Sequence, residues 1–550
     1  MLPVCYIWGY GFIKAFCKKA EFPVYHQESY LLAGFGILTV YSQVFSLIYK
    51  VSLAANIIML IITAVVAIIY RAKLIKELKE IFRKKNMAAL VVIFLLFIVF
   101  AYGTSGGYIH YDTDLYHAQS IRWIENYGVV RGLGNLHNRL AYNSAAFCLS
   151  ALFSMSFLGG QSFHVCAGFL AFIIALLCWG IFKRGKLFTP SMSNMARIVA
   201  IYYLVNIYDE MVSPASDYFV VLLVIGIVIL FLEHAENSDE SPYAYGLLSL
   251  LALIAMSVKI SAALIVFIAI YPGFLLIRNK DIKGIIKFLV AGIFSVIPFF
   301  VRNIILSGYL IYPVSGLDLF NPIYKIPLEV ASYDAKEVQV YGRGHIDVSR
   351  FDESLLVWLP EWFSHLDAIN KISFIMAVLG LVALATCLIF CLINLKKKNE
   401  VANYPVLWIV IVNAICFVTM IVTSPNIRFG CVFLWMFPVL IWGYIYRNIV
   451  SKLDKQILFK TFLCLFLAYK IVALGMDTIP RMNSEYLLYQ KDYGTYEVIA
   501  HDIGGMIIYY PREGDQTGYS YFPSVPGIPE AQMIGNDIKD GFRSTLNAGK

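Results

Sequence analysis

The stretch RAKLIKELKEIFRKKNMAALVVIFLLFIVFAYG, residues 71–103, decides how the chain is organised. Its first part, residues 71–87, carries seven Lys and Arg, whereas residues 88–103 carry none. A long apolar run of this kind predicts a membrane-spanning helix, which needs about 20 mostly apolar residues. A dense basic segment predicts a cytoplasmic location, because Lys and Arg accumulate on that side of a membrane. Residues 88–103 are therefore predicted to cross from the cytoplasm outward.

The composition of the whole chain also predicts a membrane protein. Of its 550 residues, 59% are hydrophobic and 15% are charged, against roughly 45–50% and 25% in soluble domains. The net charge of +8 does not predict nucleic-acid binding, because 22 of the 44 Lys and Arg fall in five clusters at predicted cytoplasmic turns. These clusters lie within residues 71–87, 183–197, 278–287, 396–398 and 447–460.

Apolar segments predict an all-α polytopic membrane protein with about 14 transmembrane helices. The segments are residues 2–17, 29–49, 51–70, 88–103, 162–182, 195–208, 217–233, 243–257, 259–277, 285–305, 371–394, 404–423, 429–447 and 458–476. One further apolar stretch, 141–158, cannot cross together with 162–182 if the basic cluster at 183 is to be cytoplasmic. We therefore expect 141–158 to lie in the outer interface or to form a re-entrant element.

This arrangement places three large segments outside, namely 104–161, 306–370 and 476–550. Residues 307–370 have a net charge of −5 and residues 476–550 a net charge of −4, so the outer face is acidic and the inner face basic. The predicted organisation has three parts: additional N-terminal helices with the basic loop (1–87), a transmembrane core (88–476) and a small extracytoplasmic tail (477–550). A multi-pass protein of a bacterial inner (cytoplasmic) membrane, with its working surface outside, fits this pattern.

The most informative loop is YIHYDTDLYHAQSIRWIENYG, residues 108–128. It places Asp112, Asp114 and His117 directly after a predicted span. Carboxylates at the mouth of a membrane bundle are costly to desolvate and usually have a function. A structural alternative stays open, in which Asp112 is the N-cap of a helix over 113–127 and Asp114 lies in its first turn.

A second acidic site is predicted in the short outer turn IYDEMVSPASDYF, residues 207–219. It holds Asp209, Glu210 and Asp217, and it lies near the first loop if the flanking spans are adjacent. The alternative is ordinary capping of the next helix by Ser213 or Ser216.

Three basic residues stand at predicted outer ends of spans. Arg302 closes 285–305, Arg428 opens 429–447, and Lys259 lies at an outer turn within apolar sequence. Each could face a phosphate group or simply extend its charge to the interface. The long loop 306–370 is expected to fold over the site.

Four short motifs carry a resemblance to a known superfamily. They are DTDLY (112–116), RN (302–303), GYLIYP (308–313) and SPNIRF (424–429). Their order, with an acidic first outer loop followed by a helix along the membrane, resembles the GT-C superfamily of membrane glycosyltransferases over residues 88–450. Within it, the closest resemblance is to a branch of uncharacterised bacterial polytopic proteins with a YDTDLYH-type loop. The chain departs from the superfamily pattern in three ways. Additional residues precede residue 88, Leu115 stands where an Asp-Glu motif would have Glu, and the tail has no counterpart.

The resemblance implies an inverting transfer of a sugar from a polyprenyl-phosphate carrier, held in the lipid bilayer, to a glycan, lipid or protein acceptor on the outer face. It implies Asp114, or else Asp112, as the base that takes the acceptor proton. Arg302, favoured over Arg428, would bind the leaving phosphate, and His117 and Asp217 would be further substrate-binding residues. A divalent cation, Mg²⁺ or Mn²⁺, bridging carboxylates and phosphate is left open.

Other functions remain as alternatives. A transporter would be expected to show internal repeats and interrupted helices, and no repeat is visible in the sequence. A flippase would show less outer-loop mass. A polymerase of lipid-linked saccharides would carry an Arg-rich late loop, whereas 306–370 holds only Arg343 and Arg350.

Overall fold

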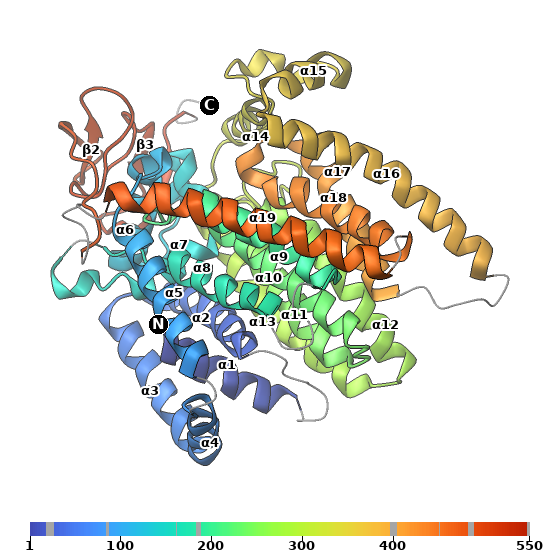
Figure 1. Ribbon diagram of the computed structural model, residues 1–550. Helices are drawn as coiled ribbons and strands as arrows, with labels where there is room; N and C mark the ends of the chain where they lie inside the picture. Colours follow the sequence, from blue (N-terminus) through green and yellow to red (C-terminus); the bar gives the residue numbers. More distant parts are fainter. Residues whose placement is uncertain are drawn as a thin grey trace.

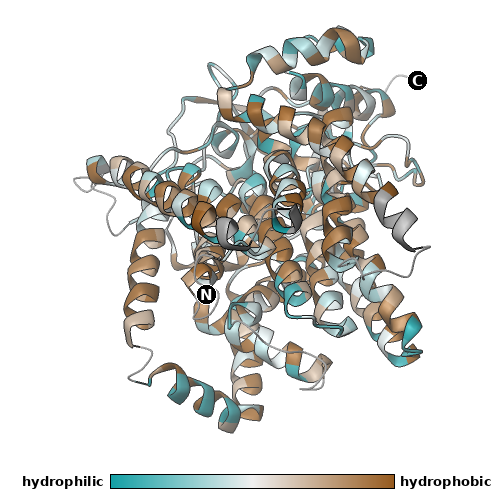
Figure 2. Ribbon diagram, turned by 45° about the vertical axis from the view of Figure 1, so that its right-hand side comes forward, coloured by the Kyte–Doolittle hydropathy of each residue, from teal (hydrophilic) through white to brown (hydrophobic). Residues whose placement is uncertain are grey.

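The computed structural model describes residues 1–17, 27–83, 87–160, 162–182, 189–395, 404–449, 452–481 and 489–546. The chain is a bundle of helices with a small β region at one end (Figure 1). Hydrophobic residues run along most helices, whereas hydrophilic residues gather at turns and helix ends (Figure 2). The predicted class, a helical multi-pass membrane protein, is confirmed at this level.

Every predicted apolar segment is helical. The helices are α1 (Leu2–Phe16), α2 (Glu28–Ile48), α3 (Leu53–Ile69), α5 (Met87–Ser105), α8 (Cys166–Cys178), α9 (Met192–Asn206), α10 (Ser216–Glu236), α11 (Pro242–Val258), η7 (Ile260–Ala269) with α12 (Ile270–Arg278), α13 (Ile282–Ser307), α16 (Ala368–Leu395), α17 (Tyr404–Thr423), α18 (Ile427–Ile449) and α19 (Lys452–Thr478). Short 3-10 helices are η3 (Leu133–Asn135), η4 (Asn138–Ala141), η5 (Ser156–Leu158), η6 (Trp179–Phe182), η8 (Val348–Asp352), η9 (Ile479–Arg481) and η10 (Ile538–Asp540).

The number of spans differs from the predicted 14. Among the described residues, nine helices are long and apolar enough to cross a membrane. A tenth is added if α3 and α4 (Arg71–Ile81), which meet at a bend of 85°, count as one span. The count of 14 is not confirmed because α1, α8, α9 and α11 are shorter, with 13 to 17 residues each.

Helix α10 lies at the centre of the bundle. It is enclosed by protein along its apolar length and packs against α8, α9, α11, α17 and α18. A helix that is hydrophobic on all sides is expected at such a position. Few side chains of α5, α13, α16 and α19 are buried, so these helices lie on the outside of the bundle.

The first two helices belong to the same core. Helix α1 packs against α2 so closely that a Cβ atom at Gly9 would lie 1.8 Å from the carbonyl oxygen of Tyr30. Small residues permit this kind of helix contact in membranes. Helix α2 in turn packs against α7, α8, α11 and α13, which joins the first predicted part to the second.

Ion pairs sort the helix ends into two groups. At one end, Arg447 near the close of α18 lies 3.6 Å from Glu236 at the close of α10. At the other end, Arg428 near the start of α18 lies 2.9 Å from Asp112 in the first predicted outer loop. Predicted inner and outer segments therefore gather at opposite ends of the bundle. Several lysines and an arginine used for the orientation lie outside the described residues, namely Lys84, Lys85, Lys183, Arg184, Lys186, Lys396, Lys397 and Lys398.

Residues 141–158 contain a short helix, α7 (Ala145–Phe153), and all nine of its residues are buried. Nine residues extend about 14 Å, about half of what a membrane core requires. The helix packs against α2, α8, α11 and α6 (Ala118–Tyr127). Protein covers every face of this helix, so it does not lie exposed on the surface of the bundle.

The predicted outer loops form structure above the bundle. Loop 306–370 contains α14 (Leu328–Gly342) and α15 (Leu355–His365). The tail forms two antiparallel hairpins, β1 (Val498–Asp502) with β2 (Ile507–Pro511) and β3 (Ala531–Met533) with β4 (Phe542–Ser544). This β region docks beside α6 (Figure 1), where Trp123 shares an apolar cluster with Ile508 and Phe542.

Candidate functional site

After α5 ends at Ser105, residues 106–110 are not helical, and a new helical segment begins at residue 111. It contains a single π-helical turn, η2 (Thr113–His117), followed by α6, which ends before Gly128. The predicted helix over 113–127 is thus present. Asp112 precedes its first residue, but its side chain makes no cap hydrogen bond. An N-cap carboxylate would accept a backbone N–H of the first turn, so capping does not account for Asp112. Single π turns are frequent at functional sites.

The carboxylate of Asp112 is instead held by arginine. Arg428 Nη2 lies 2.9 Å from Asp112 Oδ2, and Arg428 Nε lies 3.4 Å from Asp217 Oδ2. One guanidinium therefore joins the first outer loop to the start of α10. Lys259 Nζ donates to the other oxygen of Asp217.

Two further groups border this arrangement. Arg139 Nη1 lies 3.6 Å from Asp112 Oδ1, and Arg428 Nη1 lies 2.7 Å from His110 Nε2. Burial, and after it the charge of Arg428, lowers the pKa of His110, so a neutral imidazole can accept the guanidinium N–H. We call these residues the charged cluster: Asp112, Asp217, Lys259 and Arg428, with His110 and Arg139 at its edge.

The charged cluster is partly open. The side chains of Asp112 and Asp217 are 12% and 5% exposed, and those of Lys259 and Arg428 are 22% and 30% exposed. Lys259 Nζ also lies 4.0 Å from the centre of the Phe429 ring. Ion pairs at this depth are screened less than surface pairs, and the cations remain accessible to an incoming anion.

Backbone contacts explain why the cluster forms. The N–H of Tyr108 donates to the carbonyl of Asp209 at 2.7 Å, and the N–H of His110 donates to Ser213 Oγ at 2.7 Å. These bonds bring the first loop against the turn before α10, as the sequence predicted. Asp217 is the second residue of α10, and no side chain caps that helix, so the capping alternative does not explain Asp217 either.

Asp114 faces away from the cluster toward the tail. Its Oδ2 accepts from Tyr496 Oη at 2.9 Å and from the N–H of Gly494 at 3.3 Å. Its backbone carbonyl accepts the N–H groups of Thr517 and Gly518 at 3.0 and 2.9 Å. Burial raises the pKa of Asp114 against the opposing effect of these hydrogen bonds. The residue favoured as base from sequence is thus an anchor for the tail.

His117 is buried beneath the loop. Its Nδ1 lies 3.4 Å from Thr113 Oγ1, and its ring packs against Tyr116 and Phe147. Burial moves the pKa of His117 well below its usual range. The surrounding rings give it a packing role below the charged cluster.

Arg302 lies apart from the cluster as well. Its Nε donates to Asn143 Oδ1 at 2.9 Å, and its Nη1 donates to Ser46 Oγ. With 2% of the residue exposed, it ties α13 to α2 and to the segment before α7. This placement separates Arg302 from Arg428, which lies in the charged cluster.

Helix α14 covers the neighbouring wall. Tyr142 Oη donates to Asp334 Oδ1 at 2.7 Å, and Ser424 Oγ donates to the carbonyl of Val338 at 3.0 Å. Burial raises the pKa of Asp334 to about 6. Loop 306–370 thus folds beside the turn that precedes α18, near Arg428, as expected. Trp358 and Trp362 of this loop are buried.

The arrangement does not resemble a metal centre. No group of three or more His, Cys, Asp or Glu side chains suited to a metal occurs among the residues the structure describes. The two carboxylates of the cluster are joined by a guanidinium instead of facing a common point. We therefore derive no step through a divalent cation.

A family model described as Domain of unknown function (DUF8201) matches residues 1–435. The chain belongs to this family. The DUF8201 match includes the whole charged cluster and ends before α19 and the β region. Neither a curated protein nor a solved structure matches the chain.

Proposed function

We propose that this DUF8201 protein is an inverting membrane glycosyltransferase with a GT-C-like bundle, and that the charged cluster is its active site. The donor is a sugar linked to a polyprenyl phosphate in the lipid bilayer. The acceptor is a glycan, lipid or protein on the outer face of a bacterial cytoplasmic membrane, where envelope glycans are assembled. The observation that carries the proposal is the bridge from Arg428 to Asp112 and Asp217.

The roles follow from the chemistry of the transfer. The acceptor hydroxyl oxygen attacks the anomeric carbon from the side opposite the phosphate, and its proton passes to the Asp112 carboxylate. The bond from the anomeric carbon to the phosphate oxygen breaks, and both electrons stay with the carrier phosphate. Arg428 and Lys259 compensate the charge of the leaving phosphate.

Two features of the cluster support these assignments. Arg428 is a planar donor that can bind phosphate in a bidentate way, and its Nε is among the buried donors that make no hydrogen bond in the described chain. The Asp112 carboxylate is paired with Arg428 and lies near Arg139. When Arg428 binds a phosphate, it would release the Asp112 carboxylate, which could then receive a proton. Asp217 would hold Lys259 and Arg428 in place.

The proposal is tested with the full chain in lipid nanodiscs and a panel of radiolabelled polyprenyl-phosphate sugars. Release of free polyprenyl phosphate in the presence of outer-envelope acceptors is measured. We expect release with one donor and its loss in Asp112→Asn, whereas Asp347→Asn, at an exposed carboxylate of the 306–370 loop, remains active. Binding of the donor with transbilayer movement and no cleavage would support the flippase alternative and refute the transferase.

A further inference from the structure

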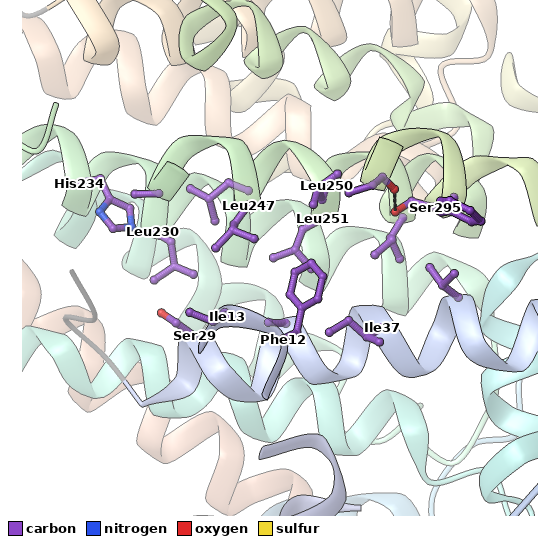
Figure 3. A pocket seen from close by; sticks show the side chains of 17 residues that line it. Phe12, Ile13, Ser29, Ile37, Leu230, His234, Leu247, Leu250, Leu251 and Ser295 are labelled. Atoms are coloured by element: carbon purple, nitrogen blue, oxygen red, sulfur yellow. Dashed lines mark hydrogen bonds between the residues drawn. The ribbon is translucent and has the colours of Figure 1, made fainter. Parts of the chain in front are cut away.

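A narrow apolar slot lies in the half of the bundle opposite the charged cluster. It has a volume of about 310 Å³ and is enclosed by α1, α2, α10, α11 and α13. In Figure 3, Leu247, Leu251 and Phe12 project into it from facing helices, and His234 and Ser295 mark its two ends. Ser295 Oγ already donates to the carbonyl of Ala291, so the slot offers an occupant almost only hydrocarbon surface.

The slot has the depth of one membrane leaflet. Along α2 its lining extends from Ser29 to Val40, which is about 16 Å at 1.5 Å per residue. Half of the hydrocarbon core of a bilayer is ~15 Å thick. Dividing the volume by this length gives a cross-section of about 19 Å², which admits a single alkyl chain.

The basic end of the slot carries lysines. Lys287 lies one turn before the lining residue Ala291 on α13, on the same helix face. Its Nζ lies 3.2 Å from the carbonyl of Phe16 and 5.8 Å from the ring centre of Tyr243. Lys287 is exposed, as is Lys283 one turn earlier. Phe294, one of the lining residues, is 69% exposed, so the slot opens sideways toward lipid.

We propose that the slot binds one acyl chain of an anionic phospholipid from the leaflet at the basic end, with its phosphate paired to Lys287 and Lys283. Water is a poor occupant, because a buried water needs two to four polar partners. Basic pockets between transmembrane helices on this side are suited to anionic headgroups. The chain would wedge the α1–α2 pair against α11 and α13, far from the proposed transfer site.

The test uses the full chain in nanodiscs with phosphatidylglycerol that carries a diazirine in the middle of one acyl chain. After illumination, cross-linked peptides are mapped by mass spectrometry. We expect labelling of peptides from α11, whose slot-lining residues are buried from bulk lipid, in the unmodified protein. Labelling of only the outward-facing helices α5, α13, α16 and α19, with none of α11, would overturn the proposal without any variant being needed.

Two variants separate the chain site from the headgroup site. Ala291→Trp fills the slot and should abolish slot labelling, whereas Ala468→Trp, on the exposed face of α19, should not. Lys287→Ala should reduce labelling by phosphatidylglycerol about fivefold, corresponding to ~1 kcal/mol for one lysine at a membrane surface. Equal labelling by phosphatidylcholine with the same diazirine chain would refute the anionic headgroup.

Discussion

Replacement of Arg428 by lysine tests the proposed active site most directly. The guanidinium forms ion pairs with Asp112 at 2.9 Å and Asp217 at 3.4 Å, and its Nη1 lies at hydrogen-bond distance, 2.7 Å, from His110 Nε2. A lysine ammonium keeps the charge but not the fork, so it cannot serve all three acceptors. One hydrogen bond that involves a charged group contributes about 1.5–3 kcal/mol. Because the Arg428 side chain is 30% exposed, solvent reduces the effect.

We therefore expect Arg428→Lys to lose roughly 2–3 kcal/mol of transition-state stabilisation, a 30- to 150-fold decrease in kcat/KM. The assay is release of polyprenyl phosphate by the full chain in nanodiscs. Arg302→Lys is the matched control, since Arg302 is a buried arginine that contacts Asn143 and Ser46 instead of the cluster. If the Arg428→Lys variant released polyprenyl phosphate as fast as the unmodified protein, while a folded Arg302→Lys variant released none, the assignment of Arg428 to the active site would be refuted.

Four further predictions follow from the contacts described above. Asp112→Asn should abolish transfer and lower the midpoint of thermal unfolding only modestly, because asparagine keeps the side-chain size and no helix cap is lost, although the ion pairs with Arg428 and Arg139 are broken. Asp114→Ala should make the tail more sensitive to limited proteolysis, since Tyr496 Oη and the N–H of Gly494 lose their acceptor. Burial raises the pKa of Asp334 to about 6 from 3.8, so the folded state keeps this proton in the range where the unfolded state has lost it. The free energy of unfolding should fall by up to ~3 kcal/mol between pH 4 and pH 6 and then level off, and Asp334→Asn should remove that fall, measured by denaturation at each pH. Single cysteines at positions 106 and 280 should react with an impermeant thiol reagent from opposite sides of a membrane vesicle; labelling from one side would refute the topology.

The helical elements could be predicted because each apolar segment is long, uninterrupted and bounded by charged or turn-forming residues. The number of membrane crossings could not be predicted in the same way. Helices α8 and α11 are as apolar as true spans, yet their length alone does not take them across a bilayer. Whether such a helix faces lipid or protein depends on its neighbours, and α10 shows how fully neighbours can enclose a hydrophobic helix.

The carboxylates of the first loop could be singled out from sequence, but their roles could not. Asp112 and Asp114 are two residues apart on one turn and point to different partners. The choice between them depends on Arg428, which is distant in the chain, and on a tail that carries no recognisable motif. The sequence favours Arg302 over Arg428 for the carrier phosphate, and only the packing of the folded chain shows that Arg428 lies in the charged cluster whereas Arg302 contacts Asn143 and Ser46.

The position of the tail gives Asp114 a consequence for Asp112. Hydrogen bonds from Thr517 and Gly518 hold the backbone of Asp114, and those from Tyr496 and Gly494 hold its side chain. All four fall on the π-helical turn that begins directly after Asp112. These contacts fix the π turn that follows Asp112, so we infer that the tail supports the loop geometry that aims Asp112 at Arg428. The DUF8201 region thus contains every residue of the charged cluster, while the orientation of its proposed base depends on contacts from residues beyond that region.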